Sequence, residues 1–231
     1  MIADNVARVQ ARIARACTAA GRPVESVTLL AVSKRFPATA VEAARAAGLR
    51  RFGENLVQEG IDKIAALRSS KDPIEWHLIG PLQSNKARVV AENFDWVQTV
   101  DRLKLAERLS AHRPAALPPL DICLQVNISG EGSKNGLAPR DAIETALAVA
   151  ALPRLNLRGL MAIPEPAEDF EAQRRPHRAL RELFESLQAE GLLLDTLSMG
   201  MSADLEAAIA EGATMVRIGS AIFGERPRPP A

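Results

Sequence analysis

The chain lacks the features that mark several common classes of protein. Its 231 residues carry 29 basic and 28 acidic side chains, a net charge of +1, so there is no charge excess to bind nucleic acid or an anionic membrane. The only cysteines, Cys17 and Cys123, both lie in apolar settings, which predicts buried free thiols in a reducing compartment rather than disulfides. No apolar run is long enough for a membrane span or a signal peptide. We therefore expect a cytoplasmic protein.

Motifs for metals, nucleotides and serine hydrolysis are also missing. His77, His112 and His177 are scattered along the chain, and with unpaired cysteines they give no zinc-binding spacing. There is no G-x-x-x-x-G-K-[ST] loop and no dinucleotide fingerprint. The segment 200–204, Gly-Met-Ser-Ala-Asp, begins like the hydrolase motif G-x-S-x-G but lacks its closing glycine. These absences argue against a metalloenzyme, a nucleotide-binding enzyme and a serine hydrolase.

What the chain does contain is a regular alternation of short apolar runs and amphipathic stretches. Apolar residues spaced as on one helix face run from Ile2 to Cys17 and predict an N-terminal helix, which ends before Pro23. The apolar runs predict strands near 27–34, 50–55, 75–80, 96–101, 120–129, 157–163, 196–201 and 215–222. The stretches between them predict helices near 38–47, 56–68, 84–92, 102–111, 139–151, 168–190 and 203–211.

About eight strands that alternate with helices form either a closed (β/α)₈ barrel or an open doubly wound sheet. The missing dinucleotide fingerprint favours the barrel. We expect an α/β protein with a single (β/α)₈ TIM-type barrel over residues 1–225 and the additional N-terminal helix. Residues 226–231 are rich in proline and predict a flexible tail.

The first predicted strand ends in a lysine. The run from Val27 to Val32 is followed by Ser33 and Lys34, with no charge partner beside the lysine in sequence. Desolvation lowers the pKa of an ammonium and favours the neutral amine, which attacks carbonyl groups. The alternative is that Lys34 extends its charged end into solvent from the strand terminus.

Polar residues close several of the predicted strands, including the first, at the barrel face where active sites lie. They are Lys34, Asn55, Asp101, Asn127, Ser202 and the segment 217–220, with His77 inside the third strand. Ser202 is a candidate N-cap of the following helix, and Gly219 with Ser220 would let the backbone approach a bound anion. The loops after strands seven and eight commonly bind phosphate in such barrels. The alternatives are a helix cap at Ser202 and a packing glycine at Gly219.

Three further residues have both a functional and a structural interpretation. Arg217 lies inside an apolar strand and needs an acceptor, which is either a ligand or a carboxylate in a structural ion pair. Asn55 follows the second strand, where a helix cap is the simpler role. His77 is more often a core histidine with satisfied hydrogen bonds than a catalytic one.

Six segments in this order resemble the YggS/PROSC family, the pyridoxal phosphate homeostasis proteins, over about residues 2–225. They are Ala31–Lys34 (AVSK), Phe52–Asn55 (FGEN), Trp76–Lys86 (WHLIGPLQSNK), Leu157–Met161 (LRGLM), Leu197–Ser202 (LSMGMS) and Met215–Gly219 (MVRIG). The resemblance implies a single barrel similar to the alanine racemase N-terminal domain, with pyridoxal 5′-phosphate (PLP) bound as a Schiff base.

The resemblance also implies roles for particular residues. Lys34 would carry the cofactor covalently, Arg217 would face the pyridine nitrogen, and Asn55 would lie near the cofactor. The residues that would bind the phosphate are Ser202, Gly219 and Ser220, where many relatives have threonine in place of Ser220. The expected cofactor-binding set is Lys34, Asn55, His77, Met201, Ser202, Arg217, Gly219 and Ser220, without catalytic or metal-binding residues.

The expected chemistry is weak. PLP is a strong electron sink when its ring nitrogen is protonated, and a guanidinium at Arg217 disfavours that protonation. Racemisation needs an acid and a base on opposite faces of the substrate, and alanine-racemase-like enzymes supply a tyrosine from a second domain of a partner subunit. This chain has no tyrosine, which leaves His77 or a cysteine as substitutes.

We therefore expect a monomeric protein that binds PLP, acts in vitamin B6 homeostasis, and passes the cofactor to apo forms of PLP-dependent enzymes. Lys86 and Lys134 are candidate secondary amines for that transfer, although ordinary surface charge is the simpler explanation. The alternatives are a weak PLP-dependent amino-acid racemase and a Schiff-base sugar-phosphate aldolase that uses Lys34.

Overall fold

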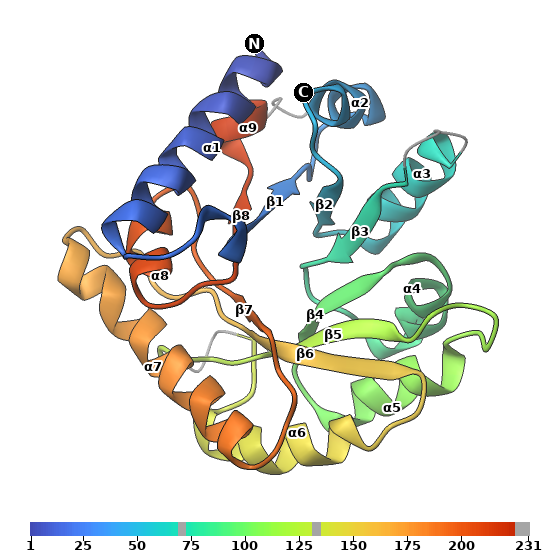
Figure 1. Ribbon diagram of the computed structural model, residues 1–231. Coiled ribbons are helices and arrows are strands. Elements are labelled where there is room, and N and C mark those ends of the chain that lie inside the picture. Colours follow the sequence, from blue (N-terminus) through green and yellow to red (C-terminus); the bar gives the residue numbers. More distant parts are fainter. Residues whose placement is uncertain (69–72, 131–134, 225–231) are drawn as a thin grey trace.

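Eight parallel strands close into a barrel in chain order, each paired with its sequence neighbours and β1 with β8. The computed structural model describes residues 1–68, 73–130 and 135–224. Figure 1 shows helices around the outside of the strand ring. The strands are β1 (Thr28–Val32), β2 (Arg51–Glu54), β3 (Glu75–Leu78), β4 (Trp96–Val100), β5 (Leu120–Gln125), β6 (Leu155–Met161), β7 (Thr196–Ser198) and β8 (Met215–Ile218). The predicted barrel and its N-terminal helix are confirmed.

All eight predicted strands are present, but most are shorter than expected. The α-helices are α1 (Ile2–Ala19), α2 (Ala38–Ala46), α3 (Val57–Leu67), α4 (Ala87–Asn93), α5 (Leu103–His112), α6 (Ala142–Ala150), α7 (Phe170–Ala189), α8 (Leu205–Ala210) and α9 (Ser220–Phe223). Short 3-10 helices are η1 (Val24–Ser26), η2 (Ser84–Lys86) and η3 (Pro139–Asp141). The prediction of one strand over 215–222 was wrong, because β8 ends at Ile218 and α9 begins at Ser220.

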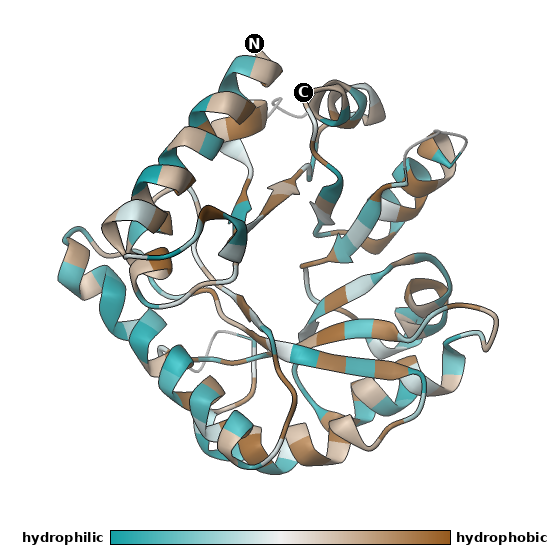
Figure 2. Cartoon of the chain, in the orientation of Figure 1, coloured by the Kyte–Doolittle hydropathy of each residue, from teal (hydrophilic) through white to brown (hydrophobic). Residues whose placement is uncertain are grey.

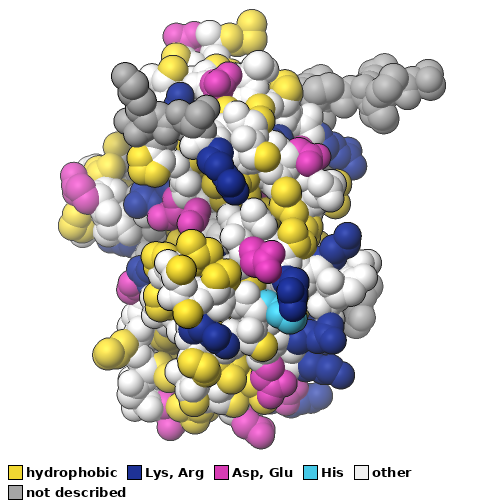
Figure 3. All heavy atoms as spheres, turned by 90° about the vertical axis from the view of Figure 1, so that its right-hand side faces the viewer, with side chains coloured by type: hydrophobic (Ala, Val, Ile, Leu, Met, Phe, Trp, Pro, Cys, Tyr) yellow, Lys and Arg dark blue, Asp and Glu magenta, His cyan; other side chains and the backbone are white. Residues whose placement is uncertain are grey.

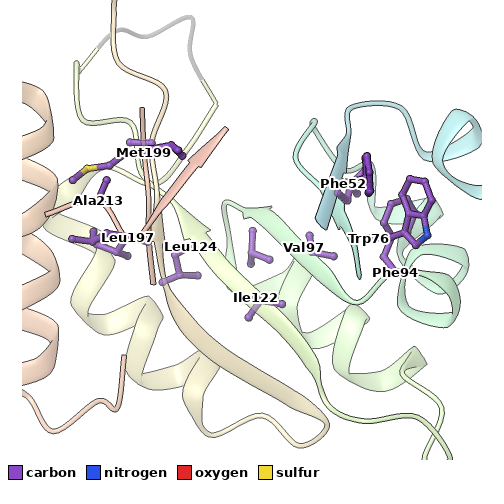
Figure 4. Close-up of a cluster of buried hydrophobic side chains, with 14 of the residues drawn as sticks. Phe52, Trp76, Phe94, Val97, Ile122, Leu124, Leu197, Met199 and Ala213 are labelled. Carbon is purple, nitrogen blue, oxygen red and sulfur yellow. The ribbon is translucent and has the colours of Figure 1, made fainter. Parts of the chain in front are cut away.

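Alternating strand residues face two different cores. One group points into the barrel, where Leu30, Val32, Ile79 and Met215 form a small apolar cluster. The other group packs against the surrounding helices in a much larger cluster, part of which is shown in Figure 4. Strands buried on both faces read as nearly continuous apolar runs, which is why the apolar runs in the sequence located them.

The helices bury one stripe each. In α7 the buried side chains are His177, Leu180, Phe184 and Leu187, spaced as on one helix face. Figure 2 shows hydrophobic segments interspersed with hydrophilic ones along the strands and mainly hydrophilic colouring along α7. Figure 3 shows acidic and basic side chains interspersed on another face. Among the described residues, no helix is long and apolar enough to cross a membrane.

The N-terminal helix is held against the end of the chain. Asn5 donates a hydrogen bond from Nδ2 to the carbonyl of Ile222 at 2.8 Å. Arg12 pairs with Glu206 on α8 and donates from Nη1 to the carbonyl of Ser202 at 2.7 Å. Figure 1 shows α1 beside α8 and α9. The extra helix therefore supports the loops that follow β7 and β8. The predicted tail, 226–231, lies outside the described residues.

Candidate functional site

The carboxyl ends of the parallel strands share one mouth of the barrel, and most of the predicted site residues follow the strands there. Lys34 comes two residues after the end of β1, Asn55 follows β2, Ser202 follows β7, and Gly219 and Ser220 follow β8. Because β7, β8, β1 and β2 are consecutive neighbours in the barrel, these residues lie on one half of the mouth. The lysine thus lies in a turn beyond the strand rather than within it.

A buried charge cluster holds the backbone on both sides of Lys34. The Nζ of Lys63, on α3, lies 2.7 Å from Glu54 Oε1 and donates to the Ser33 carbonyl at 2.8 Å. Glu59 contacts Lys63 at 2.8 Å and accepts a hydrogen bond from the amide of Arg35. Arg35 adopts φ 65°, a left-handed conformation that is uncommon for a non-glycine residue. The turn that presents Lys34 is therefore fixed by contacts with β2 and α3.

Burial and hydrogen bonding act in opposite directions on the pKa of Glu54 in this cluster. Its side chain is fully buried, and burial raises its pKa although hydrogen bonds from Lys63 and Ser33 act in the opposite direction. Its second carboxylate oxygen, Oε2, has no hydrogen-bond partner among the described residues. The ion pair with Lys63 therefore compensates only in part for the burial of this carboxylate.

The turn after β7 is fixed from two sides. The amide of Met201 donates to Asp204 Oδ1 at 2.7 Å, and Arg12 binds the Ser202 carbonyl. Burial opposes ionisation of Asp204, but hydrogen bonds from His177 and Met201 outweigh it and lower its pKa. The expectation that Ser202 is an N-cap was wrong, because α8 begins at Leu205 and Asp204 occupies that position. Both Met201 and Ser202 are half-buried at the mouth.

Gly219 brings the backbone after β8 close to β1. A Cβ at this position would lie 3.2 Å from the carbonyl oxygen of Val32, tighter than most side chains tolerate. Gly219 is also the N-cap position of α9, and Ser220, the first residue of that helix, is exposed. Amides at helix N-termini and hydroxyl groups are suitable donors to phosphate oxygens. The segment therefore offers such donors one strand away from Lys34.

Arg217 points into the barrel from β8 and is almost fully buried, with 4% of its surface exposed. Its Nη1 donates to Ser198 Oγ at 2.9 Å, and its Nη2 donates to the Ala162 carbonyl at 2.8 Å. Burial lowers the pKa of Arg217 to about 10, so the guanidinium remains charged at neutral pH. Both of these acceptors are uncharged, so within the described part of the chain Arg217 does not form the structural ion pair considered from sequence.

His77 lies deeper in the barrel than the residues at the mouth. Its Nε2 is 2.8 Å from Glu75 Oε1, and its Nδ1 is 2.9 Å from Gln98 Nε2. The ring is fully buried and stacks on Trp96 with centroids 5.0 Å apart. Burial lowers the pKa of His77 although Glu75 favours the charged form. Since both ring nitrogens have protein partners, the geometry favours the core-histidine interpretation over the predicted contact with a cofactor.

Asn55 borders a cavity of about 270 Å³ across the mouth. The lining residues are Asn55, Ile79, Pro81, Thr99, Gln125, Val126, Asn127, Asn135 and Ile163, none of them charged. The Oδ1 of Asn55 is buried and has no partner within the described part of the chain. A buried acceptor without a donor is costly, so a ligand that donates a hydrogen bond would fit here.

Gly80 allows the backbone after β3 to approach Asn55. A Cβ on Gly80 would lie 2.0 Å from the Asn55 carbonyl oxygen, while Thr99 holds the Gly80 carbonyl at 2.8 Å. We expect Gly80→Ala to lower the free energy of unfolding by about 2 kcal/mol through overpacking. Chemical denaturation measures this. Gly21→Ala, in open space at φ +64°, should cost about 1 kcal/mol from backbone strain alone; an equal cost at both positions would contradict the overlap.

Some residues that shape the site were not singled out from sequence. They are Arg12, Glu54, Lys63, Gln98 and Ser198. Gln98 and Ser198 interrupt apolar strands, which is a detectable signal of a polar interior. Lys63 and Glu59 are four residues apart on a predicted helix, but that spacing is also typical of surface ion pairs.

Of the two candidate transfer lysines, only Lys86 lies among the described residues. Lys86 ends η2 and is exposed, while Lys134 lies outside the described residues. Within the described part of the chain, no group of three or more His, Cys, Asp or Glu side chains could hold a metal ion.

Comparison with known proteins gives matches along nearly the whole chain. A family model described as the alanine racemase N-terminal domain matches residues 5–227. The pyridoxal phosphate homeostasis protein of Pseudomonas aeruginosa is 60% identical over 225 residues, covering 97% of this chain and 96% of that protein. The protein of the same name from Escherichia coli K12 is 54% identical over 226 residues, covering 97% of each.

Solved structures of other proteins share this fold. PipY of Synechococcus elongatus, solved without PLP and with PLP bound, superposes with TM-scores of 0.86 and 0.84 at 40% and 39% identity, covering 97% of this chain and 100% of PipY. An alanine racemase of Clostridium difficile shares the fold at a TM-score of 0.75 and 16% identity, with 97% of this chain and 58% of the racemase covered. The chain belongs to the pyridoxal phosphate homeostasis protein family, whose barrel is the alanine racemase N-terminal domain.

Proposed function

We propose that this protein binds pyridoxal 5′-phosphate through Lys34 and acts in intracellular vitamin B6 homeostasis by holding and releasing the cofactor without strong catalytic activity. The observation that carries the proposal is the buried, charged Arg217 on β8, next to the strand that leads into Lys34. The names of the relatives and the PLP-bound PipY structure support it.

The residues present fit this cofactor. The donor segment at Gly219 and Ser220 suits a phosphate, and the buried, unpartnered Oδ1 of Asn55 suits a donor group on the ligand. The uncharged cavity beside Asn55 is large enough for part of an aromatic ring. When bound, PLP supplies an aldehyde that bonds to an amine and a ring that withdraws electrons.

Lys34 would hold the cofactor covalently, because its amine follows β1 in a turn anchored by Glu54, Glu59 and Lys63. Arg217 would face the ring nitrogen as a hydrogen-bond donor. A charged guanidinium there disfavours protonation of the ring nitrogen, which weakens its ability to withdraw electrons. The binding residues thus favour retention over catalysis.

The groups that could replace a catalytic tyrosine are poorly suited to that role. His77 has both ring nitrogens engaged by Glu75 and Gln98. Cys123 is fully buried, and burial strongly raises the pKa of its thiol. An acid or base must reach the reacting atom in the correct protonation state. These observations support a function in binding, although the family barrel is shared with alanine racemases.

The binding proposal is tested by adding PLP to the purified protein. We expect a visible absorbance band, a borohydride-stable adduct, and an adduct mass that maps to the peptide containing Lys34. Failure of the purified protein to take up added PLP would contradict the proposal.

The non-catalytic part of the proposal needs a separate measurement. Loaded protein incubated with amino acids in deuterated water should show no exchange of the α-proton above that of free PLP. Exchange that depends on Lys34 would instead identify a PLP-dependent enzyme.

We also propose that a monomer holds the cofactor and passes it to apo-enzymes. Light scattering of the loaded protein would measure its mass in solution, and a dimer would contradict this part of the proposal. If the exposed Lys86 assists transfer, Lys86→Ala should slow activation of an apo-enzyme while Lys34 still loads. Unchanged transfer would reject that role.

A further inference from the structure

A chain of hydrogen bonds crosses the interior of the barrel and ends on Arg217. Arg217 Nη1 lies 2.9 Å from Ser198 Oγ, which lies 2.6 Å from Gln98 Oε1. Gln98 Nε2 lies 2.9 Å from His77 Nδ1, and His77 Nε2 lies 2.8 Å from Glu75 Oε1. We call these five residues the buried relay. It links β8, β7, β4 and β3 across the barrel.

Chemistry assigns one direction to every bond in the relay. A guanidinium only donates, so Ser198 Oγ accepts from Arg217 and uses its own proton to donate to Gln98 Oε1. The Gln98 amide nitrogen then donates to His77 Nδ1, and Nε2 of the neutral imidazole donates to Glu75. Every donor thus points from the cation toward the carboxylate. Because all the bonds run in the same direction, each donor in the relay has an acceptor in the next residue.

The relay is buried except at its carboxylate end. Ser198, Gln98 and His77 are fully buried, and Arg217 is 4% exposed. The Glu75 side chain is 36% exposed and also contacts Arg51 Nε at 3.1 Å, near the amino-terminal mouth of the barrel. Burial opposes ionisation of Glu75, but hydrogen bonding from His77 and the charge of Arg51 lower its pKa. The carboxylate therefore remains an acceptor at neutral pH.

A fully apolar barrel interior would stabilise the fold without burying polar groups that each need a hydrogen-bond partner. Leu30, Val32, Ile79 and Met215 fill one part of the barrel, and Trp96, Cys123 and Met161 fill another. A buried polar chain is costly if any member loses its partner. The relay also stops at Arg217, whose other terminal nitrogen is held by the Ala162 carbonyl. These two anchors together determine the direction of the guanidinium.

We propose that Ser198, Gln98, His77 and Glu75 are positioning residues, which aim and electrically support Arg217 toward the ring nitrogen of the bound cofactor. This inference rests on the proposed function. Arg217 would touch the ring, while the other four act through it over the length of the barrel. A change at Glu75, at the opposite mouth, therefore alters the electronic state of the bound ring.

The test compares loaded wild-type protein with Gln98→Leu and Ser198→Ala. We expect each variant to bind PLP roughly tenfold more weakly, the equivalent of losing about one hydrogen bond to a charged group. The pH at which the visible band changes should rise by about one unit, because a loosened guanidinium blocks protonation of the ring nitrogen less well. Asp204 and Cys123 are the titratable groups that also face Arg217, and both are unchanged in these variants.

The double variant distinguishes a relay from separate packing effects. If the residues act in series, Gln98→Leu adds little to the effect of Ser198→Ala on the band, so the two changes are not additive. Met161→Leu, a volume-conserving change inside the same barrel, serves as the control and should leave the band in place. Additive shifts, or band titrations like that of Met161→Leu, would overturn the proposal.

A milder variant covers the case in which Gln98→Leu does not fold. Glu75→Gln keeps an acceptor for His77 at the partly exposed end and removes only the charge; it should weaken binding about threefold and shift the band in the same direction. An unshifted band in a folded, loaded Glu75→Gln protein overturns the role of the terminal charge. Wild-type protein that takes up no PLP fails the proposed function, and the relay's role toward the cofactor fails with it.

Discussion

Replacement of Lys34 with alanine should abolish the borohydride-stable PLP adduct. The amine is the group that bonds to the aldehyde, and the contacts of Ser202, Gly219 and Ser220 would hold only the phosphate. We expect the dissociation constant to rise roughly a hundredfold or more, about 2.7 kcal/mol of binding free energy. Absorbance titration and intact mass after borohydride treatment measure the two effects.

The folded state should tolerate this change. Lys34 is half-buried in a turn, and a substitution there away from the core should alter the free energy of unfolding by less than about 1 kcal/mol. Lys86→Ala, at an exposed lysine, is the matched control and should load fully. An adduct of normal yield in Lys34→Ala, mapped to another lysine, would show that the anchor has been misassigned.

Replacement of Lys63 with methionine should destabilise the protein by about 3–5 kcal/mol, because it removes one partner of a buried ion pair and leaves the other buried. Lys63 and Glu54 are 5% and 0% exposed, and Nζ also binds the Ser33 carbonyl. Loosening of that turn should weaken PLP loading at Lys34 as well. Thermal or chemical unfolding of the apo-protein and a PLP titration measure these effects.

The cost of Lys63→Met should depend on pH in a defined direction. Burial already raises the pKa of Glu54 in the folded protein, and Lys63 opposes that rise. Without Lys63 the folded-state pKa rises further above the unfolded value, so the folded variant binds the proton more tightly. Its stability is then greatest below the unfolded pKa and is lost as the pH rises through the folded pKa. The variant should therefore regain stability on acidification.

Two controls separate the ion pair from other effects of the substitution. The double variant Lys63→Met with Glu54→Gln removes the uncompensated charge and should recover most of the lost stability. Lys104→Met, at an exposed position on α5, should change stability by less than about 0.5 kcal/mol. A cost for Lys63→Met that is the same at every pH and is not relieved by Glu54→Gln contradicts the role of Glu54.

Much of the barrel could be predicted because its signals are local. Strands buried on both faces are continuously apolar, and helices with one buried stripe repeat every three or four residues, so all eight strands were located. Their ends were less predictable. The predicted last strand was extended to residue 222, but the backbone turns into α9 at Ser220. Ser202 suggested a helix cap, yet Asp204 occupies the N-cap position.

The candidate site was also proposed from sequence, through Lys34, Arg217 and the polar residues that end strands. The sequence did not show that Lys63 and Glu54 brace Lys34, or that Arg12 reaches the Ser202 carbonyl, since Arg12 and Ser202 are 190 residues apart. Such contacts depend on which elements become neighbours around a closed barrel.

By itself, the sequence determined the order of strands and helices, singled out Lys34 as the lysine proposed to bind the cofactor, and showed the absence of a tyrosine that could serve as a second catalytic group. Only the tertiary structure decided that His77 faces Glu75 and Gln98 instead of the mouth, and that Arg217 is joined to them through Ser198. The physical reason is that the patterns that predict strands and helices are local and can be read from neighbouring residues. Hydrogen-bond partners inside a barrel are set by strand register and by which face of each strand turns inward.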